Sequence, residues 1–289
     1  MWTRKATMAI YGVIGCGYVG SDVAVKLKYA GHRLIGTTRS LHRLEALSDV
    51  VDEAHQLDLT DSDPDFSFLD HLDGLLISVA PTQQAEGYDG VFSRGLRNLT
   101  RALRCRTSTR DLHVTLISSA GVYGDQQGNG VNEDSALDNS NPVNALLASA
   151  EDLLLSIDRP DTRVCVLRLG GIYGPGRDMV AMIRRAAGQQ VPKNGNAIPA
   201  WSCIFDITRG VHFAFDERLE GTYNLVDDMQ LSRRELSTLI CDQEGLPPVL
   251  WGHSEPAGAR MLNAKVSNNK IKAAGFRFQS PSMLLPEAV

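Results

Sequence analysis

Short runs of β-branched and aliphatic residues alternate with amphipathic segments along the first half of the chain. Such alternation is typical of a parallel α/β sheet. The apolar runs predict strands at residues 7–14, 33–38, 50–56, 74–79, 112–118 and 163–169. The amphipathic segments predict helices at residues 18–30, 41–47, 85–104 and 142–157. Because crossovers between parallel strands are almost always right-handed, this pattern predicts a doubly wound sheet with helices on both faces.

A glycine-rich turn with GxGxxG spacing, at residues 15–20, joins the first predicted strand to the first predicted helix. Gly15 permits the tight turn, Gly17 lets the backbone approach a pyrophosphate, and Gly20 lets the helix pack closely on the strand. The helix N-terminus adds backbone N–H donors and a partial positive charge. The context predicts a Rossmann βαβ unit that binds a dinucleotide. The expected contacts come from Gly15, Gly17, Tyr18, Val19 and Gly20.

The end of the second predicted strand indicates which dinucleotide is preferred. An NAD-preferring site has Asp or Glu about 20 residues after the glycine turn, where it accepts hydrogen bonds from the ribose 2'-OH. Residues 36–44 contain no acidic side chain. The guanidinium of Arg39, with the hydroxyls of Thr38 and Ser40 and with Arg43 nearby, suits a 2'-phosphate instead. We therefore expect NADP(H), with NAD as the alternative cofactor and a solvated loop residue as the alternative interpretation of Arg39.

Two further strand ends are expected to contact the cofactor. Asp58 follows the third predicted strand, where its carboxylate either accepts from the adenine amino group or is an ordinary surface group. Ser78 and Ala80 end the fourth, where small side chains let a cofactor lie close to the backbone.

The pattern becomes less regular after residue 170. A turn-rich joint at residues 171–176 precedes a predicted helix at 179–187 and a loop at 188–199. We expect a dinucleotide-binding domain over residues 1–170 and a smaller C-terminal lobe over 171–289 that completes a substrate cleft. Residues 188–201 are expected to line that cleft, with Lys193 as their only cation.

Composition narrows the classes of ligand. Hydrophobic residues make up 43% of the chain and charged residues 22%, which is ordinary for a globular protein. A formal net charge of −5 gives no reason to expect nucleic acid or an anionic membrane as partner. No apolar run approaches ~20 residues, and the first apolar stretch is expected to be a core strand rather than a signal peptide. Five scattered cysteines predict neither a disulfide framework nor a metal site. We expect a cytoplasmic protein with a small-molecule substrate.

Four segments together carry a family resemblance. They are GCGYVGS at residues 15–21, SAGVYG at 119–124, LRLGGIYGPG at 167–176 and GTYNL at 221–225. In order and spacing they resemble the extended short-chain dehydrogenase/reductases, the NAD-dependent epimerase/dehydratase family. The GxGxxG form of the turn is similar to the atypical branch of that family. The resemblance implies oxidoreductase or epimerase chemistry on a small polar substrate such as a nucleotide sugar, and it implies a homodimer.

The resemblance also assigns catalytic positions, and two of them are changed. Ser119 stands where the family's serine hydrogen-bonds the reacting oxygen of the substrate. The family then uses a Tyr and a Lys four residues apart, followed by a Glu that matches Glu151. The Tyr and Lys positions are Val143 and Leu147 here, and no Tyr in the chain has a Lys four residues later. Tyr123 is the remaining candidate for a proton donor, with a packed core aromatic as the alternative interpretation.

Three functions remain open from the sequence. The first is an NADP(H)-dependent oxidoreductase or epimerase-like enzyme with a non-standard catalytic site built on Ser119 and Tyr123. The second is a non-catalytic sensor whose contacts depend on NADP(H) occupancy. The third, a scaffold without a cofactor, is disfavoured by the intact glycine turn.

Overall fold

The computed structural model describes residues 8–80, 85–256 and 259–284. The chain divides into two compact units. Unit 1 comprises residues 1–118, 146–167 and 208–222, and unit 2 comprises residues 119–145, 168–207 and 223–289. The chain therefore passes repeatedly from one unit to the other. The assignment of residues 1–170 and 171–289 to two functional lobes stays a prediction.

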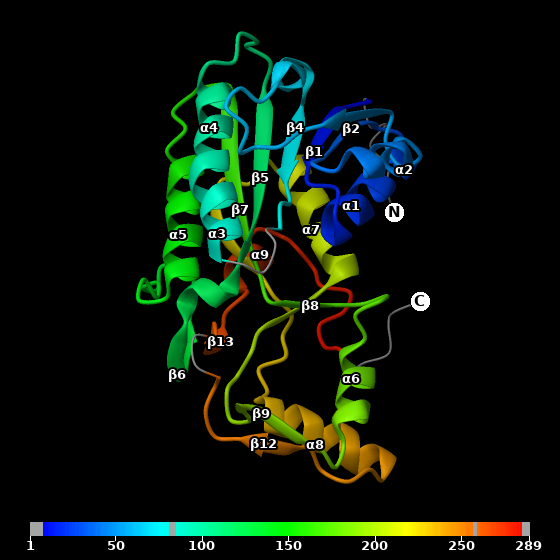
Figure 1. The fold of residues 1–289 in the computed structure, drawn as a ribbon, viewed down its shortest axis with the longest axis vertical. Coiled ribbons are helices and arrows are strands. Elements are labelled where there is room, and N and C mark those ends of the chain that lie inside the picture. The colour runs from blue at the N-terminus through cyan, green and yellow to red at the C-terminus, as the bar shows by residue number, and fades with distance from the viewer. Residues whose placement is uncertain (1–7, 81–84, 257–258, 285–289) are drawn as a thin grey trace. The chain divides into compact units, whose positions relative to one another are not determined.

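A seven-stranded sheet of parallel strands organises the fold (Figure 1). Its order is β11-β7-β5-β4-β1-β2-β3. The strands are β1 (Ile10–Ile14), β2 (Arg33–Thr38), β3 (Glu53–Gln56), β4 (Gly74–Ile77), β5 (Leu112–Ser119), β7 (Thr162–Leu169) and β11 (Gly221–Leu225). All six predicted strands belong to this sheet, although residue 7 of the first lies outside the described residues. The predicted doubly wound α/β fold is confirmed, and β11 is an edge strand that the hydrophobic pattern did not reveal.

Helices cover both faces of the sheet in unit 1. They are α1 (Tyr18–Tyr29), α2 (Leu44–Ser48), α3 (Ala85–Asp89), α4 (Leu96–Arg104), α5 (Pro142–Leu155) and α7 (Ile204–Asp216). On one face, Thr208 of α7 donates a 2.5 Å hydrogen bond to Asp22 of α1. On the other, Arg104 of α4 donates to the hydroxyl of Ser156, directly after α5. Figure 1 shows these two pairs of helices on opposite sides of the strands.

The predicted helix at residues 85–104 has three parts. Between α3 and α4, Gly90–Gly95 forms a π-helical segment. A Cβ at Gly95 would lie 2.9 Å from the Cβ of Leu59, so the helix backbone approaches the chain after β3 very closely. Leu96, Leu99 and Leu103 recur at helical spacing and are all fully buried, so they form the inward face of α4. The amphipathic pattern gave no indication that residues 90–95 are π-helical.

Among its described residues, unit 2 contains three short strand pairs and three α-helices that lie wholly within it. The pairs are β6 (Asp125–Val131) with β13 (Asn263–Val266), β8 (Gly171–Tyr173) with β10 (Trp201–Cys203), and β9 (Gln190–Asn194) with β12 (Leu250–Gly252). The helices are α6 (Met179–Ala186), α8 (Arg233–Glu244) and α9 (Asn269–Ala273). The predicted helix at 179–187 corresponds to α6, whereas the predicted loop at 188–199 contains β9. None of the helices in the described residues is long and apolar enough to cross a membrane.

Local signals explain why α8 begins and ends where it does. Ser232 accepts from the backbone N–H of Glu235, and the Glu235 carboxylate accepts from the backbone N–H of Ser232. This capping box satisfies two donors that a helix start otherwise leaves without partners. Gly245 ends the helix in the left-handed conformation at φ 65°. The apolar face of α8, with Leu236 and Ile240, packs with Ile183 of α6 in one buried cluster.

Unit 2 also buries a carboxyl group. Asp227 is only 2% exposed, and it accepts hydrogen bonds from the Tyr173 hydroxyl (3.1 Å) and the Met229 backbone N–H (3.1 Å). Burial raises the pKa of Asp227 to about 8, and the neighbouring Asp228 and Asp206 carboxylates act in the same direction. The folded protein therefore holds a proton on Asp227 more tightly than the unfolded chain does.

Replacing Asp227 with Asn tests this proton. Because the folded pKa lies above the unfolded value, the stability contributed by the protonated carboxyl is present below about pH 4 and is lost as pH rises toward 8. Over that window the wild type should lose on the order of 1.4 kcal/mol of unfolding free energy per pH unit relative to Asp227→Asn. Urea unfolding of both proteins across this range measures the difference. Parallel stability curves would contradict the assignment.

Candidate functional site

The glycine turn lies in unit 1 at the carboxyl end of β1, where the strand order reverses between β1 and β4. Gly15 has a φ of 92°, a conformation that residues with a side chain rarely adopt. A Cβ at Gly15 would lie 2.6 Å from the carbonyl oxygen of Ser78. A Cβ at Gly20 would lie 2.3 Å from the carbonyl oxygen of Gly15. Both positions exclude larger residues, so the turn is held against β4 on one side and α1 on the other.

Gly17 differs from its neighbours because its surroundings are open. A Cβ built there meets no atom within 4 Å. Helix α1 begins at the next residue, Tyr18, and a helix start presents backbone N–H groups that have no acceptor within the helix. Val19 is buried, so its side chain packs inward. The open approach to Gly17 and the first turn of α1 fit a pyrophosphate.

Cys16, between the two glycines, is a packing residue. It is 4% exposed, and its thiol lies 3.7 Å from the carbonyl oxygen of Val13. Burial raises the pKa of the thiol to about 11, so it stays protonated at neutral pH.

Two arginines follow β2. Arg43 donates from Nη2 to the carbonyl oxygen of Cys16 at 3.2 Å, which places its guanidinium against the glycine turn. Arg39 is exposed, and no described residue forms an ion pair with its guanidinium or accepts a hydrogen bond from it. Thr38 is buried and accepts from the backbone N–H of Ser40. The Ser40 hydroxyl lies 2.7 Å from Nδ1 of His42. The structure thus groups the predicted 2'-phosphate ligands at one end of β2.

The remaining predicted cofactor contacts flank this edge. Asp58 accepts from the backbone N–H and the hydroxyl of Thr60 through one carboxylate oxygen, Oδ1. Ser78 donates its backbone N–H to Ile14 of β1, and Ala80 is exposed. The residues assigned to the cofactor lie within unit 1, and their contact with a cofactor stays a prediction.

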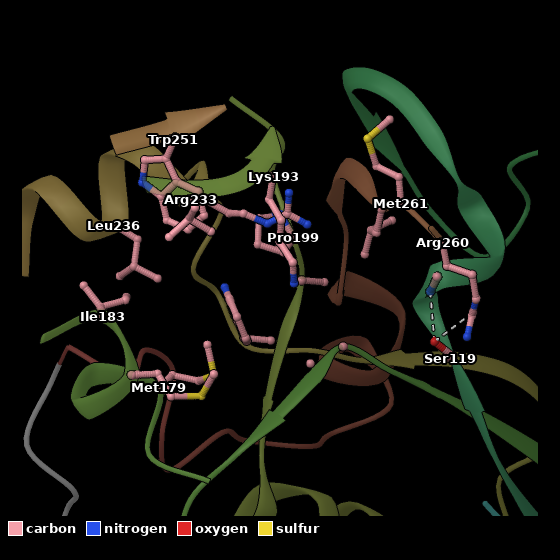
Figure 2. Close-up of a pocket in the computed structure, with 18 of the residues that line it drawn as sticks. Ser119, Met179, Ile183, Lys193, Pro199, Arg233, Leu236, Trp251, Arg260 and Met261 are labelled. Atoms are coloured by element: carbon pink, nitrogen blue, oxygen red, sulfur yellow. Dashed lines mark hydrogen bonds between the residues drawn. The ribbon is translucent and has the colours of Figure 1, made fainter. Parts of the chain in front are cut away.

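A cavity of about 510 Å³ lies in unit 2. Figure 2 shows Ser119 and Arg260 at one end of it, with Trp251, Leu236 and Ile183 toward the other. Val191, Lys193, Pro199 and Trp201, from the segment 188–201, also line it. That this segment borders a substrate cleft stays a prediction. Arg260 comes from a segment, residues 253–262, in which no motif indicated a function.

The Ser119 hydroxyl has two donors in this cavity. The backbone N–H of Gly121 donates to Oγ at 3.1 Å, and Nη2 of Arg260 donates at 3.4 Å. With two hydrogen bonds accepted, the hydroxyl proton is directed toward a third partner. Arg260 also covers Gly121 closely, because a Cβ at Gly121 would lie 2.5 Å from its Nη2.

Tyr123, the second predicted catalytic residue, is fully buried. Its hydroxyl donates to Oδ1 of Asn224 and accepts from Nη1 of Arg168, both at 2.9 Å. The Arg168 guanidinium also lies 5.1 Å from the ring centroid. Burial raises the pKa of the Tyr123 hydroxyl, although Arg168 opposes this effect. Tyr123 is not among the residues that line the cavity, and its contacts are those of a packed aromatic.

The positions of the missing Tyr and Lys hold apolar side chains. Val143 is half-buried and Leu147 is buried in α5. Glu151 is also buried and accepts a 2.5 Å hydrogen bond from the Ser118 hydroxyl, so it ties α5 to β5. Asn144, beside the Tyr position, is buried and accepts from Nε of Arg260 at 2.9 Å. Arg260, from a distant part of the sequence, therefore contacts α5 at the residue next to the expected Tyr position.

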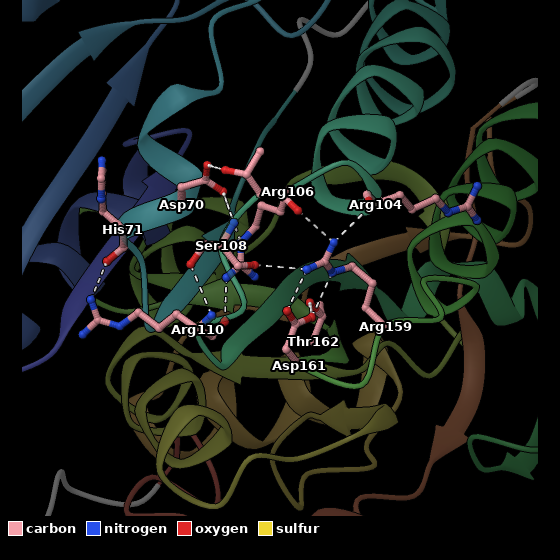
Figure 3. A network of polar contacts seen from close by, with 10 residues as sticks. Asp70, His71, Arg104, Arg106, Ser108, Arg110, Arg159, Asp161 and Thr162 are labelled. Atoms are coloured by element: carbon pink, nitrogen blue, oxygen red, sulfur yellow. Dashed lines mark hydrogen bonds and ion pairs between the residues drawn. The ribbon is translucent and has the colours of Figure 1, made fainter.

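A second cluster of charged side chains, at the amino end of β5 in unit 1, is structural (Figure 3). Arg159 donates from its guanidinium to the backbone carbonyls of Arg104, Arg106 and Ser108, and it pairs with Asp161 at 2.7 Å. Hydrogen bonds from Arg159 lower the pKa of Asp161 to about 2. These bonds close the loop between α4 and β5. Among the described residues, no group of His, Cys, Asp or Glu side chains could hold a metal ion.

Known proteins are similar to this chain over more than 90% of its length. Protein YeeZ of Escherichia coli K12 is 28% identical over 94% of this chain and 97% of its own. A solved structure from Methylobacillus flagellatus is 27% identical, covers 96% of each chain and superposes with a TM-score of 0.74. MoeE5, solved in complex with UDP-glucuronic acid and NAD, is 20% identical, covers 91% of each chain and has a TM-score of 0.73.

The matching family model is described as the NAD dependent epimerase/dehydratase family, and it matches residues 12–225. The match runs from β1 through the glycine turn and Ser119 to the end of β11, and it confirms the resemblance found in the sequence. This chain belongs to the NAD dependent epimerase/dehydratase family.

Proposed function

We propose that the chain binds NADP(H) at the glycine turn of unit 1 and acts as an oxidoreductase or epimerase-like enzyme on a small polar substrate held in the cavity of unit 2. The observation that carries the proposal is the open space at Gly17 before the start of α1, beside a turn that Gly15 and Gly20 hold in place. When bound, a nicotinamide dinucleotide supplies or accepts a hydride. Family membership supports this cofactor class. The complex of MoeE5 with UDP-glucuronic acid supports a nucleotide sugar as one candidate substrate.

The preference for NADP(H) over NAD rests on charge at the end of β2. Arg43 lies against the glycine turn through its hydrogen bond to Cys16, and Arg39 is exposed with no partner among the described residues. Residues 36–44 carry no carboxylate that would accept from a ribose 2'-OH or repel a 2'-phosphate. A phosphate between two guanidinium groups would gain charge-assisted hydrogen bonds.

Ser119 is the residue proposed to bind the reacting oxygen of the substrate. Its Oγ accepts from Gly121 and Arg260, so its own proton is available to a carbonyl or hydroxyl oxygen in the cavity. Tyr123 was the other sequence candidate, but its hydroxyl is committed to Asn224 and Arg168. The proposal therefore assigns substrate contact to Ser119 and a structural role to Tyr123.

A non-catalytic NADP(H) sensor is the second candidate, and Val143 and Leu147 favour it. Loss of a positioned acid or base typically lowers a rate by about 10²–10⁴-fold. Single-turnover hydride transfer between NADP(H) and a panel of carbonyl compounds and nucleotide sugars separates the two functions. Transfer to any of them supports the enzyme, whereas tight NADPH binding without transfer supports the sensor.

Gly17→Ala should weaken NADPH binding without unfolding the protein. The added methyl group enters the open space that a pyrophosphate needs, so we expect Kd to rise roughly tenfold, about 1.4 kcal/mol. Gly130→Ala is the matched control, because its Cβ also meets nothing within 4 Å. Calorimetric titration measures Kd, and urea unfolding checks stability. Equal NADPH affinity of Gly17→Ala and the wild type would place the cofactor elsewhere.

Arg39→Ala should discriminate between the two cofactors. Removing a charge-assisted contact of about 1.5–3 kcal/mol should weaken NADPH binding by about 10–100-fold and leave NADH binding unchanged. Arg33→Ala, at the opposite end of β2, should change neither affinity. The four Kd values are compared at one ionic strength. A variant that binds both cofactors as the wild type does would remove Arg39 from the site.

Tyr123→Phe should destabilise the fold rather than affect the cofactor. Without its hydroxyl, Asn224 and Arg168 each lose a buried partner, which costs about 1–3 kcal/mol of unfolding free energy. Tyr29→Phe, which removes a hydroxyl from a side chain that is 87% exposed, should have no effect. Denaturant unfolding and NADPH titration of both variants provide the readouts. Unchanged stability together with lost hydride transfer would make Tyr123 the proton donor.

A further inference from the structure

The charges that line the cavity of unit 2 are positive. Lys193, Arg233 and Arg260 line it, and no Asp or Glu stands among its described lining residues. The whole chain, in contrast, has a formal net charge of −5. Apolar walls concentrate the field of such cations on a bound group, so the cavity selects for negative charge.

The three cations differ in their surroundings. Arg233 forms an ion pair with Glu255 and donates to the backbone carbonyl of Asn194 at 2.9 Å, so its charge is already compensated. Lys193 is exposed. Arg260 is half-buried, and Figure 2 shows its guanidinium beside the Ser119 hydroxyl.

Arg260 is held in this position by a second residue. The Nε atom of Arg260 donates to Oδ1 of Asn144 at 2.9 Å. The amide group of Asn144 donates in turn to Oδ2 of Asp138 at 3.2 Å, which orients the amide so that its oxygen faces Arg260. Asn144 is only 1% exposed, so this orientation is fixed by packing as well.

We infer that Arg260, beside Ser119, binds a carboxylate or phosphate group of the substrate, with Asn144 as the residue that positions Arg260. A guanidinium is planar and matches either anion with two parallel hydrogen bonds. The inference rests on the proposed function in one respect, because it takes the cavity of unit 2 as the substrate site.

The other lining residues indicate the chemistry of the part of the substrate that does not carry the anion. Trp201, Trp251 and Met179 contribute apolar surface to the same cavity. The indole N–H of Trp251 is already bonded to Ser237, so this side chain offers ring surface rather than a donor. The substrate class is therefore an organic anion that joins a carboxylate or phosphate to an apolar or aromatic portion.

Three probes of similar shape test this class by calorimetric titration without any dinucleotide. Phenyl phosphate and benzoate carry the two anions on an aromatic ring, and benzyl alcohol is their neutral counterpart. We expect at least one anion to bind and benzyl alcohol to bind far more weakly. The tighter of the two anions identifies the group that the substrate carries. Equal binding of all three, or binding of none, would overturn the inference.

Substitutions then locate the anion. Arg260→Gln should weaken binding of the preferred anion by about 10–100-fold, and Arg260→Lys should weaken it less because the charge remains. Arg234→Gln is the matched control, because Arg234 carries the same charge but does not line the cavity. This variant should bind the anion as the wild type does. Wild-type affinity in Arg260→Gln would contradict the assignment.

A double-mutant cycle tests the role of Asn144. If Asn144 acts only by positioning Arg260, Asn144→Ala weakens anion binding in the wild type and has no further effect in Arg260→Gln. A general packing defect would instead give additive losses.

Titration with NADPH separates this inference from the proposed function. The Arg260 variants should bind NADPH as the wild type does, because Arg260 is not among the residues assigned to the cofactor. Anion binding that depends on Arg260 in a protein without NADPH affinity would refute the proposed cofactor and retain the anion site. NADPH binding without anion selectivity would refute the anion site and retain the proposed cofactor.

Discussion

The carbonyl oxygen of Ser78 lies so close to Gly15 that no side chain fits between them, and this contact determines much of unit 1. It occurs where the strand order reverses, so it joins the two halves of the sheet at their carboxyl ends. Gly20 repeats the constraint between α1 and the turn. Helix α1 begins at Tyr18, directly after the open position at Gly17, and its first backbone N–H groups have no acceptor within the helix. The proposed anion site would therefore result from close packing rather than from charged side chains.

Charge enters at two separate places, one in each unit. In unit 1, Arg39 and Arg43 follow β2, and Arg43 lies against the glycine turn. In unit 2, Arg260 and Lys193 line a cavity that is otherwise largely apolar. Both concentrations of positive charge occur in a chain with a net charge of −5. The net charge gave no reason to expect a polyanion as partner, and it carried no information about where cationic side chains gather locally.

Local patterns in the sequence were sufficient for the sheet and the turn. The strand at residues 33–38 and the burial of Leu96, Leu99 and Leu103 follow from hydrophobic periodicity, which depends on neighbours along the chain. The π-helical segment at Gly90–Gly95 was not predicted: it lies against Leu59, more than thirty residues away, and such a contact leaves no sign in the local periodicity. The same holds for β11, which contains polar residues and reads as a strand only because β7 lies beside it.

In the candidate site, too, residues within a local motif could be predicted, whereas residues brought in by distant contacts could not. Ser119 was found because it precedes a recognisable Val-Tyr-Gly run, whereas Arg260 stands in a segment without a motif and reaches Ser119 only through the fold. The function of Tyr123 was ambiguous in the sequence because a catalytic and a packed tyrosine have the same neighbours along the chain. Its contacts with Asn224 and Arg168, both distant in sequence, favour the packed role.

Backbone hydrogen–deuterium exchange of the wild-type protein, with and without saturating NADPH, tests the central claim most directly. The account predicts slower exchange in peptides that cover residues 15–21, because N–H groups at the start of α1 would gain phosphate acceptors. It also predicts slower exchange at residues 38–43 with NADPH and a smaller effect there with NADH. Unchanged exchange at residues 15–21 under saturating NADPH would contradict the account.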